Sequence, residues 1–199
     1  MRFLKNISGL WLVQECRRAL AEAGDPLDYE ELTALAGEAE PFRTLVATGW
    51  PLLAEPGGMP AKLRAYARAT GQPEPDTPGR LVRCCLESLA LTYARVLDQL
   101  EAVLARRFEV LHIVGGGSRN GVLNRMTADA TGRVTVVGPA EATAVGNLLV
   151  QAMGSGEVAD PATIRRIVRA SFPTGTIRPR PDPAWDRARE CWAALPENV

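Results

Sequence analysis

One stretch of the chain, residues 109–126, constrains its fold more than any other. Residues 110–114 form a short apolar run rich in β-branched side chains, and three consecutive glycines, 115–117, follow it. A run of this kind bounded by glycine is typical of a buried strand. Polar residues come next and open a helix that Ser118 or Asn120 could cap. The pattern therefore predicts a strand, a tight glycine turn and a helix start.

A glycine turn in this position favours contact with a phosphate or nucleotide. Glycine permits positive φ and lets a ligand approach the backbone closely, and the free N–H groups at a helix start attract anions. The residues leave open the alternative of a strand-to-helix turn without a ligand.

Two well-known nucleotide motifs do not fit this turn. A P-loop requires Gly-Lys-Ser/Thr after the glycines, whereas this chain has Gly117-Ser118-Arg119. A Rossmann fingerprint requires a third glycine where this chain has Asn120. Glu141, which follows the second predicted strand, does occupy a position like that of the ribose-binding acid of that fold. A Rossmann-like dinucleotide-binding domain is therefore kept as the less favoured alternative.

A second strand and helix follow the first. Residues 134–137 are predicted as a strand that ends at Gly138-Pro139, with a helix from about 141 to 153. Two strands joined by a helix should be parallel, with a right-handed crossover. Ligands bind outside the carboxyl ends of such strands, so 115–117 and 138–143 should lie at one rim. Residues 109–154 are thus the predicted nucleotide-side units.

The rest of the chain is predicted to be mostly helical. Apolar residues recur at three- and four-residue steps between 80 and 107, which predicts one long helix that serves as a scaffold. Residues 40–60 are rich in proline and glycine and are predicted to form a loop or insertion over the surface. Only two strands are evident, too few for a self-sufficient sheet.

Composition narrows the classes of function. The 23 Lys and Arg balance 23 Asp and Glu, which argues against a nucleic-acid partner. No apolar run approaches a membrane span and no signal peptide is evident, so no membrane partner is expected. The four cysteines lack metal-binding spacing and suit a reducing, cytoplasmic location. The single histidine, His112, is interpreted as a core or sheet residue.

Four stretches, in this order, resemble the C-terminal part of the FGGY carbohydrate kinases: residues 2–18, 78–91, 111–120 and 138–147. The first stretch is most similar to family members that act on L-rhamnulose. The resemblance implies an α/β fold of the actin-like ATPase (ribonuclease H-like) type, helix-rich with a small parallel sheet. It also implies that residues 1–199 are a truncated C-terminal domain that lacks its first strands.

The resemblance further implies transfer of the ATP γ-phosphoryl group to a hydroxyl of L-rhamnulose, aided by Mg²⁺. Carried over from the family, Gln14, Gly116, Gly117 and Ser118 would contact ATP or ADP, and Asn6 the sugar. Without the resemblance, Asn6 fits equally well as a helix-capping amide and Gln14 as a surface amide.

The carboxylate that activates the attacking hydroxyl in such kinases is implied to lie in an N-terminal half that this chain lacks. Asp129 falls inside a predicted helix, and Glu141 fits a ligand-side or capping role. We therefore expect no catalysis by this chain alone, and we expect the missing half to be its partner. A non-catalytic nucleotide-binding or interaction module of the same fold is the alternative. An uncovered sheet edge would expose apolar surface and promote self-association.

Overall fold

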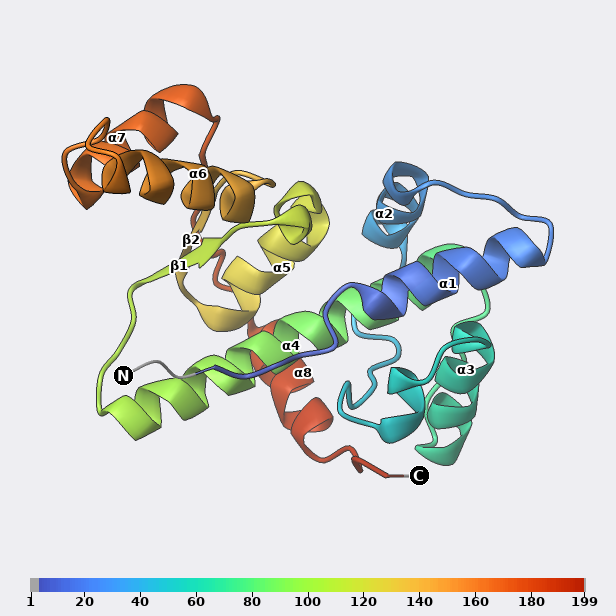
Figure 1. Cartoon of the computed structure of the whole chain (residues 1–199). Coiled ribbons are helices and arrows are strands. Elements are labelled where there is room, and N and C mark those ends of the chain that lie inside the picture. Colours follow the sequence, from blue (N-terminus) through green and yellow to red (C-terminus); the bar gives the residue numbers. More distant parts are fainter. Residues whose placement is uncertain (1–3, 199) are drawn as a thin grey trace.

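The computed structural model describes residues 4–198, and helices dominate it (Figure 1). In chain order the elements are α1 (Trp11–Glu22), α2 (Tyr29–Glu38), the 3₁₀ turn η1 (Pro51–Ala54), α3 (Met59–Ala69), α4 (Pro78–Leu104), β1 (Val110–Ile113), the 3₁₀ turn η2 (Gly116–Arg119), α5 (Gly121–Thr131), β2 (Val134–Val137), α6 (Ala142–Gly154), α7 (Pro161–Ser171), β3 (Gly175–Ile177) and α8 (Pro183–Ala193).

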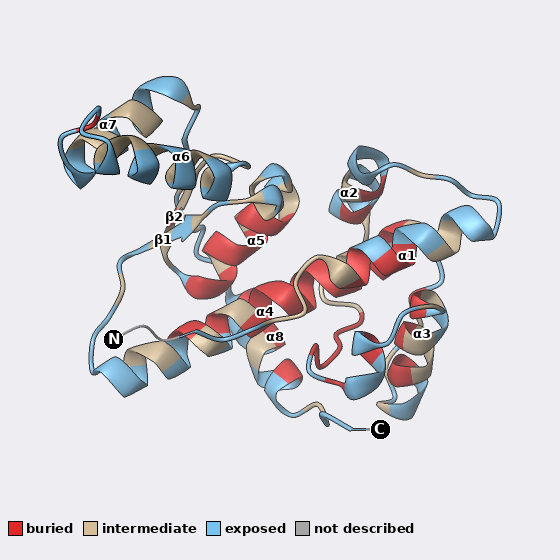
Figure 2. Ribbon diagram, in the orientation of Figure 1, coloured by how far each residue is buried: buried red, intermediate tan, exposed pale blue. Residues whose placement is uncertain are grey.

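The long helix α4 runs through the middle of the molecule, as Figure 2 shows by its buried central turns. It begins two residues before the predicted start, because the Thr77 side chain accepts a hydrogen bond from the Arg80 N–H and Pro78 occupies the first turn. It ends at Leu104, where Ala105 adopts a left-handed conformation with φ of 48°. Helices α2 and α5 both pack along it, so α4 is the scaffold to which the other elements attach.

The hydrophobic core surrounds α4 and includes residues from every helix except α6 and α7. Its fully buried large side chains include Leu12, Leu32, Leu53, Leu63, Tyr66, Leu86 and Leu89. The Trp192 ring on α8 closes this core, and its Nε1–H donates to the Val46 carbonyl at 2.7 Å. The core therefore joins the two ends of the described chain.

Residues 40–58 form a loop interrupted by η1, and Met59 already begins α3. Much of the loop lies on the surface as expected, but its central part is buried. Residues 44–48 are all buried. Side chains from other parts of the chain form hydrogen bonds with the backbone of this segment. The Gln72 amide bonds both the N–H and the carbonyl of Leu45 at 2.9 Å. The Ser88 hydroxyl accepts from the Val46 N–H at 2.9 Å. Because these partners are distant in sequence, the residues of the loop alone could not show which side chains would satisfy its buried backbone.

The sheet has the strand order β1-β2-β3. Strands β1 and β2 are parallel, with Val110 opposite Val134, as predicted. Strand β3 pairs antiparallel with β2, so the expectation of a purely parallel sheet is wrong and the sheet is mixed. Three residues after a proline give no pattern from which β3 could be predicted.

Helices α6 and α7 stand at one end of the molecule, beside the sheet (Figure 1). Neither contains a buried residue. Helix α6 is nevertheless largely apolar, and its Leu148 and Val150 side chains are 67% and 54% exposed. Across residues 4–198, no helix combines the length and the apolar character needed to cross a membrane.

Candidate functional site

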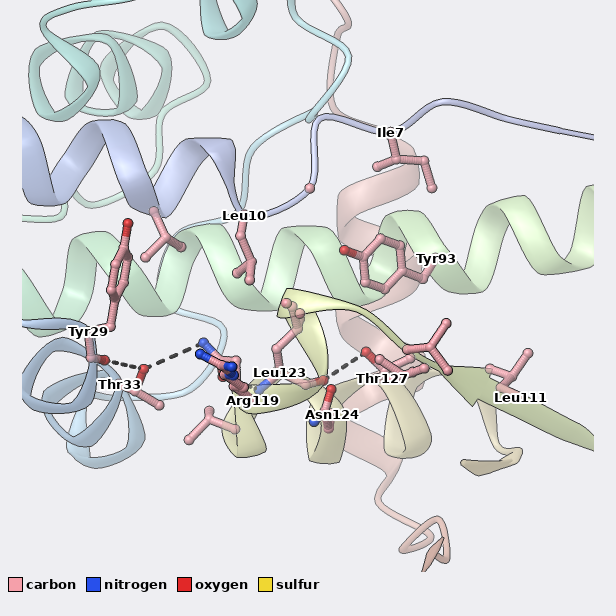
Figure 3. A pocket seen from close by; sticks show the side chains of 18 of the residues that line it. Ile7, Leu10, Tyr29, Thr33, Tyr93, Leu111, Arg119, Leu123, Asn124 and Thr127 are labelled. Atoms are coloured by element: carbon pink, nitrogen blue, oxygen red, sulfur yellow. Dashed lines mark hydrogen bonds between the residues drawn. The ribbon is translucent and has the colours of Figure 1, made fainter. Parts of the chain in front are cut away.

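A groove of about 1380 Å³ lies between the segment 7–14, α2, α4, β1 and α5 (Figure 3). Its polar end consists of residues from α1, α2 and the loop 115–120, hereafter the glycine loop: Gln14, Glu30, Thr33, Gly116, Gly117, Arg119 and Asn120. Its apolar end consists of residues from the segment before α1, from α4 and from β1: Ile7, Tyr93, Val96, Leu97, Leu100, Leu111 and Ile113.

The glycine loop has the backbone that the sequence predicted. Gly115 adopts φ of 83°, which disfavours any other residue there. Its N–H donates to the Pro139 carbonyl at 3.0 Å, and the Gly138 N–H donates to the Ile113 carbonyl at 2.8 Å. The loops after β1 and β2 therefore meet at one rim, as expected, although only the glycine loop lines the groove.

Gly116 and Gly117 are not required by the packing of the protein itself. A Cβ atom added at either position would meet no heavy atom within 4 Å, and neither residue has a positive φ. Both line the groove. The missing side chains thus leave open space at the polar end, through which a ligand could reach the backbone.

Two asparagines on consecutive turns hold the glycine loop in place. The Asn120 Oδ1 accepts from the Leu123 N–H at 2.8 Å and caps α5, so the cap is Asn120 rather than Ser118. The Asn124 Nδ2 donates to the Ser118 carbonyl at 2.8 Å. Asn124 is only 2% exposed, and its Oδ1 has no hydrogen-bond partner within residues 4–198.

The structure brings some of the predicted site residues together and separates others. Gln14 is exposed on α1 and lines the groove with Gly116 and Gly117. Ser118 lies in the same loop but does not line the groove. Asn6 is exposed and is also absent from the lining.

Sequence reasoning missed Thr33 and Asn124. Thr33 comes from α2, and its hydroxyl lies 3.5 Å from the Asn120 Nδ2 across the polar end. No local pattern in the sequence connects α2 with the glycine loop. Asn124 could have been found, because it lies four residues after Asn120 and so on the same helix face.

The ionisable groups near the groove do not form a metal centre. No group of three or more His, Cys, Asp or Glu that could hold a metal occurs within residues 4–198. Glu141 is exposed and lies 3.4 Å from the Arg119 guanidinium. Asp129 accepts the Arg180 N–H at 2.8 Å, which is a structural role. Residues 4–198 therefore contain no ready-made cluster of side chains for a metal ion.

The most deeply buried carboxylate among residues 4–198 lies away from the groove. Glu87 on α4 accepts from the Arg83 Nε at 2.7 Å and from the Phe42 N–H at 2.8 Å. Burial raises its pKa to about 7, against the opposing effect of the Arg83 guanidinium. Because it faces the loop 42–48 and does not line the groove, it joins two structural elements and has no contact with a ligand there.

Comparisons with known proteins identify the family of the chain. The family model for the C-terminal domain of the FGGY family of carbohydrate kinases matches residues 1–155. Rhamnulokinase from Bacteroides thetaiotaomicron is 45% identical over 188 residues, covering 94% of this chain and 38% of that protein. Rhamnulokinase from Bacillus subtilis is 38% identical over 180 residues, covering 90% of this chain and 36% of that protein.

A solved structure also matches, that of xylulose kinase from Rhodospirillum rubrum. Its TM-score is 0.65 at 26% identity, and the match covers 94% of this chain and 37% of that one. The chain thus spans less than two-fifths of the length of each relative named here. On the evidence of the family model and of these relatives, the chain belongs to the FGGY family of carbohydrate kinases, of which it represents the C-terminal domain.

Proposed function

We propose that this chain supplies the nucleotide side of a sugar kinase that transfers the γ-phosphoryl group of ATP to a hydroxyl of L-rhamnulose. The rhamnulokinase relatives support this choice of reaction. The observation that carries the proposal is the polar end of the groove. Gly116 and Gly117, which the packing of the protein does not require, line it together with polar side chains such as Gln14 and Thr33.

In this proposal the nucleotide binds along the glycine loop. The Gly116 and Gly117 backbone allows its close approach, and the exposed Gln14 amide faces the same space from α1. Ser118 contributes through the loop position that Asn124 fixes. Asn6 lies outside the groove and is proposed to contact the sugar only in the complete kinase.

The remainder of the reaction is assigned to polypeptide beyond this chain. Phosphoryl transfer requires a carboxylate beside the attacking hydroxyl, and a metal ion at the phosphates. Residues 4–198 hold no group of three or more His, Cys, Asp or Glu that could bind a metal, and the family resemblance assigns the catalytic carboxylate to the N-terminal half. Magnesium, when bound, would neutralise charge on the phosphates, with ligands from elsewhere. We therefore propose that the chain alone does not phosphorylate sugar, and that it acts in the cytoplasm with the remaining kinase polypeptide.

Isothermal titration calorimetry with ATP tests the nucleotide assignment. With one wall of the cleft present, we expect a dissociation constant on the order of 1 mM, which corresponds to about −4 kcal/mol. Gln14→Ala should weaken binding about fivefold, since one polar contact is worth roughly 1 kcal/mol. Gln99→Ala is the matched control, because Gln99 is exposed on α4 and outside the groove. Equal affinity for both variants would exclude Gln14 from the site.

The catalytic part of the proposal has a separate test. The isolated chain, mixed with ATP, Mg²⁺ and L-rhamnulose, should form no ADP above the rate without sugar. Sugar-dependent formation of ADP by this chain alone would show that it carries its own catalytic base.

A further inference from the structure

The first turn of α2 places an aromatic ring at the groove. Tyr29 is part of the lining and is 48% exposed. The Arg17 guanidinium lies 4.7 Å from the centroid of the ring, and the Arg17 Nε donates to the Leu27 carbonyl at 3.3 Å. These contacts hold the ring in place before a ligand binds. An exposed aromatic ring that is already positioned offers a stacking surface to a flat ligand.

A series of hydrogen bonds orients an amide near this ring. The Asn120 Oδ1 accepts from the Leu123 N–H, so its Nδ2 is directed away from the start of α5. The Thr33 hydroxyl donates its only proton to the Tyr29 carbonyl at 2.6 Å, and Figure 3 shows these two residues together at the groove. The Thr33 oxygen therefore faces the Asn120 Nδ2 as an acceptor, at 3.5 Å. Since the amide nitrogen carries two N–H groups, one remains to donate to a ligand.

The charged residues of the lining give a bound nucleotide a direction. Arg119 belongs to the glycine loop, whereas Glu30 belongs to α2. The N-terminus of α2 also carries the carboxylates of Asp28 and Glu31, which form its capping box. Because like charges repel, a polyphosphate favours the glycine loop over α2. The uncharged base is then the part of the nucleotide that meets α2.

We propose that α2 and Asn120 form the subsite for the base of the nucleotide, where Tyr29 stacks on a purine ring and the Asn120 Nδ2 donates to one of its ring nitrogens. This inference rests on the proposed function. A purine offers a larger stacking area than a pyrimidine, and stacking on aromatic side chains contributes strongly to the binding of bases. The apolar end of the groove, by comparison, contains no side-chain amide.

Titration of the whole chain with adenosine, followed by NMR, tests the role of Tyr29. Adenosine is the probe because it carries the base without the phosphates. Tyr29→Leu should weaken adenosine binding about fivefold or more, since it removes the stacking surface. Tyr29→Phe keeps the ring and should retain most of the affinity. Both variants keep the Tyr29 carbonyl that accepts from Thr33.

Asn120→Asp tests the amide separately. Aspartate caps a helix about as well as asparagine, so the unfolding midpoint should stay close to that of the wild type. The substitution replaces the Nδ2 donor with an acceptor, and adenosine affinity should fall about threefold or more. Because adenosine is uncharged, the new carboxylate does not repel the probe itself. Uridine, with its smaller ring, should bind the wild type more weakly than adenosine.

Three results would overturn the base subsite. These are the absence of adenosine binding by the wild type, equal affinity of Tyr29→Leu and wild type, and loss of binding in Leu100→Ala but not in Tyr29→Leu. The last would place the base at the apolar end, which Leu100 lines. ATP binding that still depends on Gly116 would then leave the proposed function standing. Conversely, if adenosine binding depends on Tyr29 but ATP binds no more tightly than adenosine, the phosphate assignment fails and the base subsite remains.

Discussion

The side-chain amide of Asn124 donates to the backbone carbonyl of Ser118 across 2.8 Å. This bond crosses from α5 to the glycine loop, and both groups belong to one short segment of the chain. Because Asn124 is 2% exposed, water does not compete for the bond. Together with the Asn120 cap, this buried amide therefore fixes the position of the loop relative to α5.

Asn124→Asp should destabilise the chain and weaken ATP binding together. The new carboxylate would face the Ser118 carbonyl without a donor and would be buried, at a cost of about 1–3 kcal/mol. Urea denaturation and calorimetry with ATP measure the two effects. Asn147→Asp on α6 is the control, since its Oδ1 only accepts from Gln151 at an exposed site and this capacity is kept. Unchanged stability of Asn124→Asp would contradict the assigned role.

Gly115 and Gly116 should respond differently to alanine. Gly115 has φ of 83°, so Gly115→Ala should destabilise the fold by about 1 kcal/mol or more. A Cβ at Gly116 meets nothing within 4 Å, so Gly116→Ala should leave the free energy of unfolding unchanged and reduce ATP affinity. Thermal unfolding and titration of both variants separate backbone strain from ligand contact. Equal ATP affinity of Gly116→Ala and wild type would remove Gly116 from the site.

Glu87 should make stability depend on pH. Its pKa is raised from 4.5 to about 7 by burial, with the Arg83 guanidinium opposing the shift. Between these two values the folded chain holds a proton that the unfolded chain has released, so stability should fall as pH rises from about 4.5 to 7 and then level off. The loss is at most about 3 kcal/mol, at 1.36 kcal/mol per pKa unit.

Glu87→Gln removes this titration. The difference between the unfolding free energies of wild type and Glu87→Gln, followed by urea denaturation from pH 4 to 8, isolates the contribution of this carboxyl. A constant difference across that range would show that Glu87 keeps the same protonation in both states.

Trp192→Phe should destabilise the chain by about 1–3 kcal/mol, because it leaves the buried Val46 carbonyl without its donor. Trp11→Phe offers a matched control. The Trp11 Nε1 donates to the Leu53 carbonyl at 3.2 Å, but in a partly exposed setting where water can replace it. Urea denaturation should therefore give a clearly smaller loss for Trp11→Phe. Similar losses would mean that ring volume, rather than the hydrogen bond, decides.

Local patterns explain what could be predicted from the sequence. The apolar steps of α4 and the β-branched run of β1 are signals within a single element, and the glycines mark the turn between β1 and α5 directly. The meeting of the loops after β1 and β2 followed from the rule for parallel strands and is borne out by the Gly115–Pro139 hydrogen bond.

Long-range partners explain what could not be predicted. Strand β3 exists only because Thr135 lies opposite Ile177. Thr33 reaches the polar end only because α2 packs on α4. Neither contact produces a periodic pattern of apolar residues in the sequence, so predictions made one element at a time could not find it.

The buried loop segment 44–48 is held by partners that are far away in sequence. Its hydrogen-bond partners lie 27 residues away at Gln72, 42 away at Ser88 and 146 away at Trp192. Closing such long intervals costs entropy before any contact forms. The hydrogen bonds of the loop therefore form only in the native arrangement of α4, α8 and the segment after α3, so the loop ties together parts of the chain that are far apart in sequence.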